Sequence, residues 1–542
     1  MGAEDDGLGH VRAVFPQDLS VEQGACVRGM TAARLCGVPE RVFITTDEGR
    51  PVSLDDALRE MANLLGAGRP RASVLVDLNR PLEGVLGMGA LCRATGADFA
   101  PFAPPQDLPF VRAGLTACPD FAGLADCDLV IAVGDPFSTH PAVARRVRDM
   151  QFGERGNKLL SVDTAEGRTG RGADTALAVG PQKLAGFLAA LAIECGAESV
   201  AQALDGMTAG HIADKLALDR AQVEQVAEAL KKAKAPGIVV SNTPGRYAHP
   251  EAVVGIAGQL GAALDCGVWP LLSSTNSALL PWLRGEMGAV EPGALMGEGG
   301  GASGILLVVG CDPAAVLPER LWRGLCEGTR VVCFAASLGG PFAEAANVVL
   351  PLALPWEEQG TVLAPSGERV DCPAWMPRPD GLPDAAELAN RMAAAAGLDM
   401  DIPEVPSGDA PTKPDVSELV GCEILEVSGP AEGEAVLVGS PEPQGATGLI
   451  PLSDASWQRR LVAEEAAFLD AGLAQSAGLA PEGVVKLDGE AQAAVPYEVK
   501  KGMPGTVAVP AHWGAARELI SWRTEEGGLE AAPAKVRIEK DD

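Results

Sequence analysis

Two short turns carry the residues of this sequence that are best placed to hold a ligand. Gly134-Asp135-Pro136 follows the apolar run 128–133, and a basic helical run, 142–150, comes after it. Another apolar run, 158–163, ends in Asp163. This order of strand, tight turn, helix and strand predicts a βαβ unit. Such a unit places the turn and Asp163 at the carboxyl edge of a parallel sheet, where α/β proteins bind nucleotides and other ligands.

The same pattern returns in residues 304–350. The turn Gly310-Cys311-Asp312-Pro313 follows the apolar run 304–309, and 330–334 is the next apolar run. The order of strand, turn and second strand is the same as in the first unit. The sequence therefore predicts two related α/β modules that face each other within one chain.

Basic side chains follow the first turn. His140 opens the helical run and could contact a dinucleotide or the end of a neighbouring helix. A histidine at such a position is more often hydrogen-bonded to backbone groups. Arg145, Arg146 and Arg148 could bind phosphate, although a basic helical face is commonly just solvated. The sequence leaves both interpretations open.

Composition bounds the fold and the partners. A chain of 542 residues with 47% apolar side chains is long enough for about three to four domains with sizeable cores. The formal charge of −30 argues against nucleic acid or an anionic membrane surface as a partner. Residues 1–6 have neither a basic region nor an apolar core, and the longest helical apolar run, 184–193, is too short to span a bilayer. We therefore expect a cytoplasmic protein without direct membrane insertion, which meets a membrane only through partner subunits.

The paired modules resemble the large subunits of the molybdopterin oxidoreductase superfamily. The strand-Gly-x-Asn-Pro turn of that family is matched by Gly134-Asp135-Pro136, which is one residue shorter, and by Gly310-Cys311-Asp312-Pro313. Its Val-Asp strand ending is matched by Val162-Asp163, and its Glu-x-x-Gly-Thr segment by 357–361. The version in this chain looks nearest to the molybdopterin-fold large subunit of NADH:quinone oxidoreductase and to formate dehydrogenase-like chains.

The resemblance implies an α/β fold in which two facing Rossmann-like parallel-sheet domains are followed by a C-terminal β-barrel of double-psi type. The expected division is a remnant of an N-terminal Fe–S domain, a discontinuous first α/β domain, a second α/β domain, a linker and the barrel. Their ranges, in that order, are 1–50, 51–116 with 206–398, 117–205, 399–434 and 435–542.

The resemblance also implies a cofactor. In the family, each α/β domain offers strand-end loops to one half of a bis-molybdopterin guanine dinucleotide that carries Mo or W. The corresponding residues of this chain lie at the two turns and at the neighbouring strand end. The expected cofactor-binding residues are Gly134, Asp135, Pro136, His140, Asp163, Gly310, Asp312 and Pro313.

The metal-binding parts of the family pattern are incomplete. Cys26 resembles the fourth cysteine of the family's [4Fe–4S] set, but residues 1–25 contain no cysteine, and such a cluster needs four ligands. A complete [4Fe–4S] cluster is therefore not expected. The loop that carries the family's Mo or W ligand corresponds to 96–114, which contains no Cys, Ser or His. Asp98 or Asp107 could serve there only as an oxygen ligand.

Three functions remain open. The first is a subunit of a cytoplasmic electron-transfer complex of the NADH:quinone oxidoreductase or formate dehydrogenase kind, without a catalytic metal of its own and with Fe–S and flavin subunits as partners. The second is an active Mo or W bis-pterin oxidoreductase, of the type found in formate dehydrogenase or in the molybdopterin-binding subunit of formylmethanofuran dehydrogenase. The third, from fold analogy alone, is a nucleotide- or thiamine-diphosphate-binding protein. The segment 357–361 favours the first two, and no catalytic residue stands out in the sequence.

Overall fold

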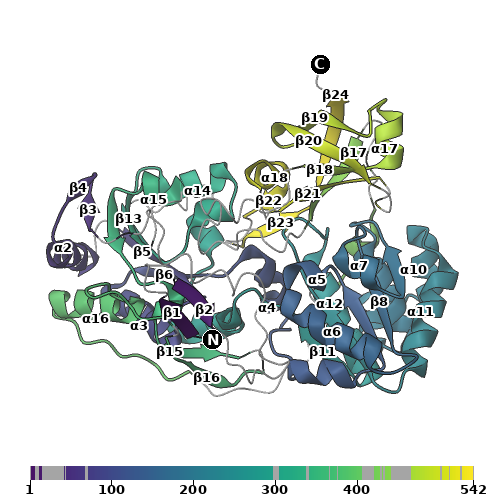
Figure 1. The fold of residues 1–542 in the computed structure, drawn as a ribbon, viewed down its shortest axis with the longest axis horizontal. Coiled ribbons are helices and arrows are strands. Elements are labelled where there is room, and N and C mark those ends of the chain that lie inside the picture. Colours follow the sequence, from purple (N-terminus) through teal and green to yellow (C-terminus); the bar gives the residue numbers. More distant parts are fainter. Residues whose placement is uncertain are drawn as a thin grey trace.

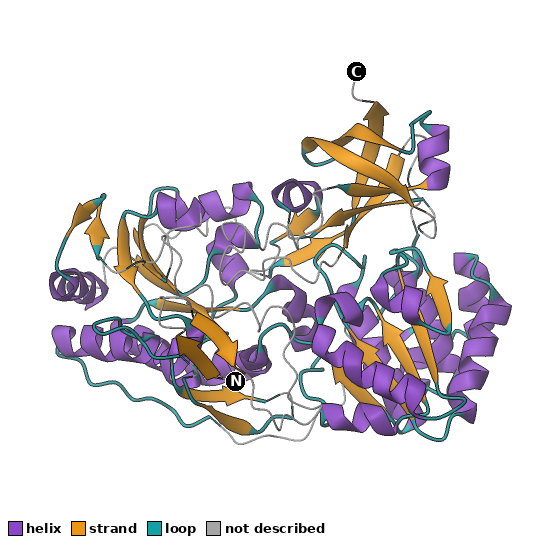
Figure 2. Cartoon of the chain, viewed as in Figure 1, coloured by secondary structure: helices purple, strands orange, loops and turns teal. Residues whose placement is uncertain are grey.

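The structure, a computed structural model, consists of two α/β modules and a C-terminal barrel (Figure 1). Figure 2 distinguishes the helices from the strands in the same view. The residues that the structure describes are 2–5, 11–14, 42, 44–66, 71–296, 304–336, 341–364, 366–374, 376–405, 420–427, 430, 434–440, 466–500, 503, 505–511, 513–524 and 528–540.

The first module is built on a seven-stranded sheet with the order β4-β3-β14-β13-β12-β5-β6. Its five strands from β14 to β6 run parallel, and β3 pairs antiparallel with β14. The strands are β3 (Thr46–Asp47), β4 (Arg50–Pro51), β5 (Arg71–Asp77), β6 (Asp98–Phe102), β12 (Gly304–Val309), β13 (Arg330–Ala335) and β14 (Val348–Pro351). The helices of this module are α2 (Leu54–Gly66), α3 (Leu82–Thr95), α13 (Leu280–Met287), α14 (Glu319–Cys326), α15 (Pro341–Ala345) and α16 (Ala385–Ala396).

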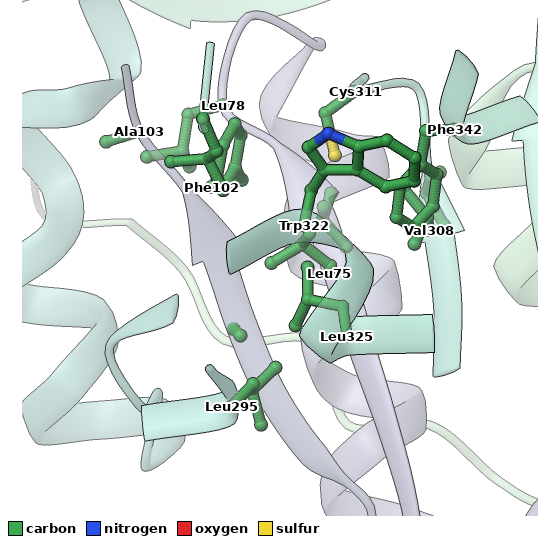
Figure 3. Close-up of a cluster of buried hydrophobic side chains, with 14 of the residues drawn as sticks. Leu75, Leu78, Phe102, Ala103, Leu295, Val308, Cys311, Trp322, Leu325 and Phe342 are labelled. Atoms are coloured by element: carbon green, nitrogen blue, oxygen red, sulfur yellow. The ribbon is translucent and has the colours of Figure 1, made fainter. Parts of the chain in front are cut away.

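Continuous apolar runs explain why this sheet is buried on both faces, as parallel sheets usually are. The side chains of 305–309 in β12 are all buried. Near the carboxyl ends of the strands, Trp322 of α14 meets Phe342 of α15 edge to face, with ring centroids 6.2 Å apart. Cys311, from the second of the two turns, belongs to the same core cluster (Figure 3). The turn is therefore anchored in the core of its module.

The second module has a five-stranded parallel sheet with the order β11-β10-β7-β8-β9. Its strands are β7 (Leu129–Val133), β8 (Lys158–Asp163), β9 (Thr175–Ala178), β10 (Pro236–Val240) and β11 (Gly267–Pro270). Its helices are α5 (Pro136–Thr139), α6 (Pro141–Gly153), α7 (Arg168–Gly172), α8 (Leu184–Glu194), α9 (Glu198–Ala203), α10 (Ala209–Leu216), α11 (Arg220–Lys232) and α12 (Pro250–Leu264). A short helix, α4 (Leu108–Arg112), leads from the first module and packs against α12.

The two modules are circular permutations of each other. Along the sheets, β6-β5-β12-β13-β14 corresponds to β11-β10-β7-β8-β9. In the first module the chain forms β5 and β6 before β12, whereas in the second it forms β10 and β11 after β9. The second module lies between β6 and β12 in the sequence. The predicted correspondence of the two turns is confirmed, because β7 and β12 occupy the same place in their sheets.

The second module extends further along the chain than the sequence suggested. We expected it to end at residue 205 and 206–398 to belong to the first domain. β10 and β11, however, pair beside β7, so the chain up to Pro270 completes the second sheet. The helix 220–232 therefore returns the chain to its own sheet rather than to the other module. In the same way, the first sheet begins earlier than residue 51, where we expected the first α/β domain to start, because β3 and β4 extend it.

The C-terminal part forms a closed barrel with the strand order β17-β21-β18-β20-β19-β24. The barrel strands are β17 (Glu434–Ser440), β18 (Ala467–Asp470), β19 (Glu482–Asp488), β20 (Gln492–Lys500), β21 (Thr506–Pro510) and β24 (Ala534–Lys540). Beside it lie α17 (Ala471–Ser476), α18 (Gly514–Leu519) and the pair β22 (Ser521–Arg523) and β23 (Glu530–Ala532). A C-terminal β-barrel is thus confirmed.

Two further strand pairs complete the fold. They are β1 (Gly2–Asp5) with β2 (Val11–Val14) and β15 (Gly360–Leu363) with β16 (Arg369–Cys372). Within the expected linker 399–434, Ile424 and Leu425 are buried in the core of the second module. In the part of the chain that the structure describes, no helix is both long and apolar enough to cross a membrane.

Candidate functional site at the carboxyl edges of the sheets

The two predicted turns have the same backbone geometry. Gly134 donates its N–H to the carbonyl of Val162 (2.9 Å), and Gly310 donates to the carbonyl of Phe334 (3.0 Å). Both glycines have positive φ, 86° and 76° respectively, which other residues rarely adopt. A Cβ at Gly134 would lie 2.3 Å from the hydroxyl of Tyr247. Close approach and backbone conformation together require glycine here.

The carboxylate of Asp135 points into its own module. It accepts hydrogen bonds from the backbone N–H groups of Arg168 (3.0 Å) and Thr169 (2.8 Å), at the start of α7. The hydroxyls of Ser138 (2.8 Å) and Thr169 (2.6 Å) donate to it as well. A buried acid with four donors at a helix start acts as a structural cap. Pro136 follows as the first residue of α5, where its missing N–H costs nothing.

Asp163 is bound by an arginine that the sequence analysis did not single out. Arg246, in the turn after β10, donates from Nε to Asp163 Oδ1 (3.0 Å) and from Nη2 to Oδ2 (2.5 Å). The two side chains are only 3% and 5% exposed. Such a two-point contact is the strongest geometry for a guanidinium and a carboxylate. Both carboxylate oxygens of the expected nucleotide-binding acid are therefore engaged within the chain.

The first module has another buried ion pair at the corresponding edge of its sheet. Arg80, in the turn after β5, donates from Nη1 to Glu358 (2.6 Å) and to the carbonyl of Ala353 (2.6 Å). Both charged side chains are 2% exposed. A Cβ at Gly310 would lie 2.4 Å from Arg80 Nε, so the guanidinium packs directly on the turn after β12. Arg80 and Arg246 thus follow corresponding strands, β5 and β10, and each packs at its own sheet edge.

The two modules differ in the residue that follows the carbonyl bound by each glycine turn. Val162 and Phe334 receive the matching hydrogen bonds from the two glycine turns. The next residues are Asp163 in the second module and Ala335 in the first. In dinucleotide-binding folds the acid near this strand end binds a ribose hydroxyl. One module has no such acid, and in the other the acid is held by Arg246.

The remaining predicted residues have local partners. The ring of His140 is hydrogen-bonded through Nε2 to the carbonyl of Leu272 (3.0 Å), which requires Nε2 to carry a proton. Asp312 accepts from the N–H of Ala314 (3.0 Å), and burial raises the pKa of Asp312 to about 6. Pro313 is the first residue of the short helix that this acid caps. The structure thus places these residues in two separate clusters, one at each sheet edge.

Asp107, one of the two acids considered as an oxygen ligand of Mo or W, links the two modules through hydrogen bonds. It lies in the loop after β6 and accepts from the N–H groups of Ser273 (2.7 Å) and Ser274 (2.9 Å), in the loop after β11. The hydroxyl of Ser277 is its third donor (2.8 Å). Burial raises the pKa of Asp107 to about 6. Asp98 lies at the amino end of β6, opposite the strand ends, so neither acid is arranged as a metal ligand.

Metal ligands are not gathered elsewhere in the described residues. No group of three or more His, Cys, Asp or Glu side chains in that part of the chain could hold a metal ion. Cys26 lies outside the residues that the structure describes. Burial raises the pKa of Cys118 and of Cys266 to about 12; Cys118 is buried in the core, and Cys266 is half-buried against it.

Comparison with solved structures identifies the fold. Acetylene hydratase from Pelobacter acetylenicus superposes with a TM-score of 0.73 over 99% of this chain and 98% of that chain, at 13% sequence identity. The formyltransferase/hydrolase complex from Methylorubrum extorquens, in complex with methylofuran, matches 65% of this chain and 98% of a chain of that structure, with a TM-score of 0.47 and 18% identity. The first likeness shows that the chain has the fold of acetylene hydratase, a molybdopterin enzyme. No family model and no curated protein matches the sequence.

The residues at the two edges do not fit a bis-pterin guanine dinucleotide. Asp163 is engaged by Arg246, Asp135 caps a helix, and Ala335 supplies no polar group. The Arg80–Glu358 pair occupies the corresponding edge of the first module. Each sheet edge thus holds a buried ion pair formed within the chain itself.

Proposed function

We propose that the chain is a molybdopterin-oxidoreductase-fold subunit of a multi-subunit electron-transfer complex and works without a catalytic metal of its own. The observation that carries this proposal is the buried two-point contact between Arg246 and Asp163. A guanidinium in this place satisfies the acid that a nucleotide would otherwise use. The pair thus favours a scaffold over a cofactor carrier.

The expected assembly is cytoplasmic, with Fe–S and flavin subunits as partners. The resemblance of 357–361 to the molybdopterin-fold large subunit of NADH:quinone oxidoreductase and to formate dehydrogenase-like chains motivates this choice. A scaffold of this kind would contribute surface and rigidity, and electrons would pass through the centres of the other subunits. The charge of −30 suits partners with basic surfaces.

A second candidate is an active Mo or W bis-pterin oxidoreductase, of the type found in formate dehydrogenase or in the molybdopterin-binding subunit of formylmethanofuran dehydrogenase. One observation favours it: buried polar atoms at the strand ends have no hydrogen-bond partner within the described residues. They are Asp77 Oδ2, Arg80 Nε, Thr164 Oγ1, Asn242 Oδ1 and Ser274 Oγ. Such atoms usually bind water or a ligand. Arg80 belongs to one of the two buried ion pairs, and Thr164 follows Asp163 of the other.

Affinity purification of the intact complex from the native host tests the proposal. We expect Fe–S and flavin subunits to copurify with the chain, and formate-dependent dye reduction to be absent from the isolated chain after cofactor loading. Formate-dependent dye reduction by the isolated chain would support the second candidate. Recovery of the chain alone, without redox partners, would contradict the proposed role in an electron-transfer complex.

A further inference from the structure

Arg246 also contacts the C-terminal barrel. Its Nη1 donates to the carbonyl of Gly439 near the end of β17 (3.0 Å), while Nε and Nη2 hold Asp163. Nη2 reaches the carbonyl of Ala165 as well (3.2 Å). One planar guanidinium therefore joins the end of β8, the turn after β10 and the barrel. The compact ammonium of a lysine could not make these contacts in fixed directions.

The backbones of the barrel and the second module touch at the same point. Gly439 donates its N–H to the carbonyl of Gly245 (3.0 Å), and Gly245 donates to the carbonyl of Ala531 in β23 (3.3 Å). A Cβ on Gly439 would lie 2.0 Å from the carbonyl oxygen of Pro244. Ala165 packs beside this contact in an apolar cluster with barrel residues Val436, Val438, Met503 and Ala508. The contact is therefore close, with apolar side chains packed beside it.

The barrel also contacts the first module, with which it shares one apolar core cluster. Arg517 of α18 donates to the carbonyl of Ala315, and Arg320 of α14 reaches Glu490 at 3.4 Å. The side chains of Arg320 and Glu490 are 50% and 48% exposed. Exposed ion pairs contribute little to stability, whereas the loss of one partner of a buried pair is strongly destabilising. The contact at Arg246 differs from the exposed ion pair in that both of its charged side chains are buried.

We propose that Arg246 fixes the C-terminal barrel on the second module by binding Asp163 and the carbonyl of Gly439 at the same time. We call this pair of contacts the latch. The acid at the strand end orients the guanidinium, and the guanidinium then presents Nη1 to Gly439. Arg246 is a positioning residue in this account and touches no substrate. The latch is a property of the folded chain, so it does not depend on which partners the chain has.

Hydrogen exchange of the full chain, measured by mass spectrometry, tests the latch. In Arg246→Ala, the amides of Gly439 and Gly245 should exchange about tenfold faster or more, because both donate across the contact and one partner of a buried pair is lost. Amides within the β19–β20 pair should keep their rates. The matched control is Arg112→Ala, which removes ion pairs to Glu251 and Glu291 away from the barrel. It should leave both reporter amides unchanged.

Two further measurements keep the test decisive if Arg246→Ala folds poorly. Gly439→Ala leaves Arg246 and Asp163 intact but places a methyl group against Pro244, so it should speed exchange at Gly245 by a similar factor. Added guanidinium ion should slow exchange again in Arg246→Ala but not in Gly439→Ala, since only the first variant leaves an open carboxylate. Unchanged exchange at Gly439 and Gly245 in both variants would overturn the latch. Faster exchange spread evenly over the second module would also overturn it, because Arg246 would then only stabilise its own module.

Discussion

Asp163 and Ala335 occupy the same position in the two modules, one residue beyond the carbonyl that binds each glycine turn. At this position only the second module has an acid, and Arg246 engages that acid. The same fold in a cofactor-binding enzyme would need these positions for its ligand. The alanine at one edge and the internal ion pair at the other are the two observations on which the proposed scaffold role rests.

Removal of one charge from the pair should destabilise the fold. Asp163→Asn leaves Arg246 buried without a carboxylate, so we expect a loss of about 3–5 kcal/mol in the free energy of unfolding. The double variant Asp163→Leu/Arg246→Met should lose less stability than either Asp163→Leu or Arg246→Met alone, since no buried charge remains unpaired. Urea unfolding followed by circular dichroism measures both. Additive losses in the double variant would show that the two side chains do not act as a pair.

The glycine turns should not accept alanine. Gly134→Ala and Gly310→Ala combine a positive φ with a Cβ within 2.4 Å of another side chain, so each should cost more than about 1 kcal/mol of stability. The control is Gly324→Ala in α14, where a Cβ meets nothing within 4 Å. Alanine there should raise stability by about 0.5–1 kcal/mol because it lowers the entropy of the unfolded chain. If the turn variants and Gly324→Ala changed stability equally, the result would contradict the backbone geometry assigned to the two turns.

Asp107 should make stability depend on pH. Its folded pKa of about 6 is above the unfolded value of 3.8, so its contribution to stability is present below the unfolded pKa and is lost as pH rises through about 6. The stability difference between the wild type and Asp107→Asn should therefore shift against the wild type by about 3 kcal/mol between about pH 4 and pH 7. Unfolding at a series of pH values measures this difference. A difference that stays constant, or that changes in the opposite direction, would contradict the raised pKa.

Cys118 and Cys266 should resist thiol reagents. Burial raises the pKa of Cys118 and Cys266 to about 12, so almost no thiolate exists at neutral pH. Labelling of the native protein followed by peptide mass spectrometry should find both unmodified, and denaturant should make both reactive. Rapid labelling of either residue in the native state would contradict its raised pKa.

Local rules recovered much of the fold from the sequence. The apolar runs 129–133 and 305–309 are long and β-rich, and the turns after them need glycine, so both strands and their correspondence could be predicted. Asp219 and Asp384 each precede a helix, and both cap it, with bonds of 2.9 and 2.7 Å to Ala221 and Glu387. These features depend on residues close together in the sequence.

Features that depend on distant contacts were missed. Nothing near 236–240 shows that this strand joins β7 rather than the first sheet, because register and neighbour choice are set by tertiary packing. Arg246 likewise meets Asp163 across 83 residues. The available signal was weak: a turn, Pro244-Gly245-Arg246, directly after a buried strand, as Arg80 follows β5. Comparison of the two modules by strand order, and not only by glycine turn, would have paired these arginines.

The most direct test of the central claim is the amount of Mo and W per chain in the complex purified from its native host. Inductively coupled plasma mass spectrometry on the intact complex, with Fe measured alongside, gives this ratio for the chain and its partners. We expect neither Mo nor W in proportion to this chain, and Fe that is accounted for by partner subunits. One Mo or W atom per chain would contradict the account, because a pterin cofactor would then occupy the edges that Arg80 and Arg246 fill.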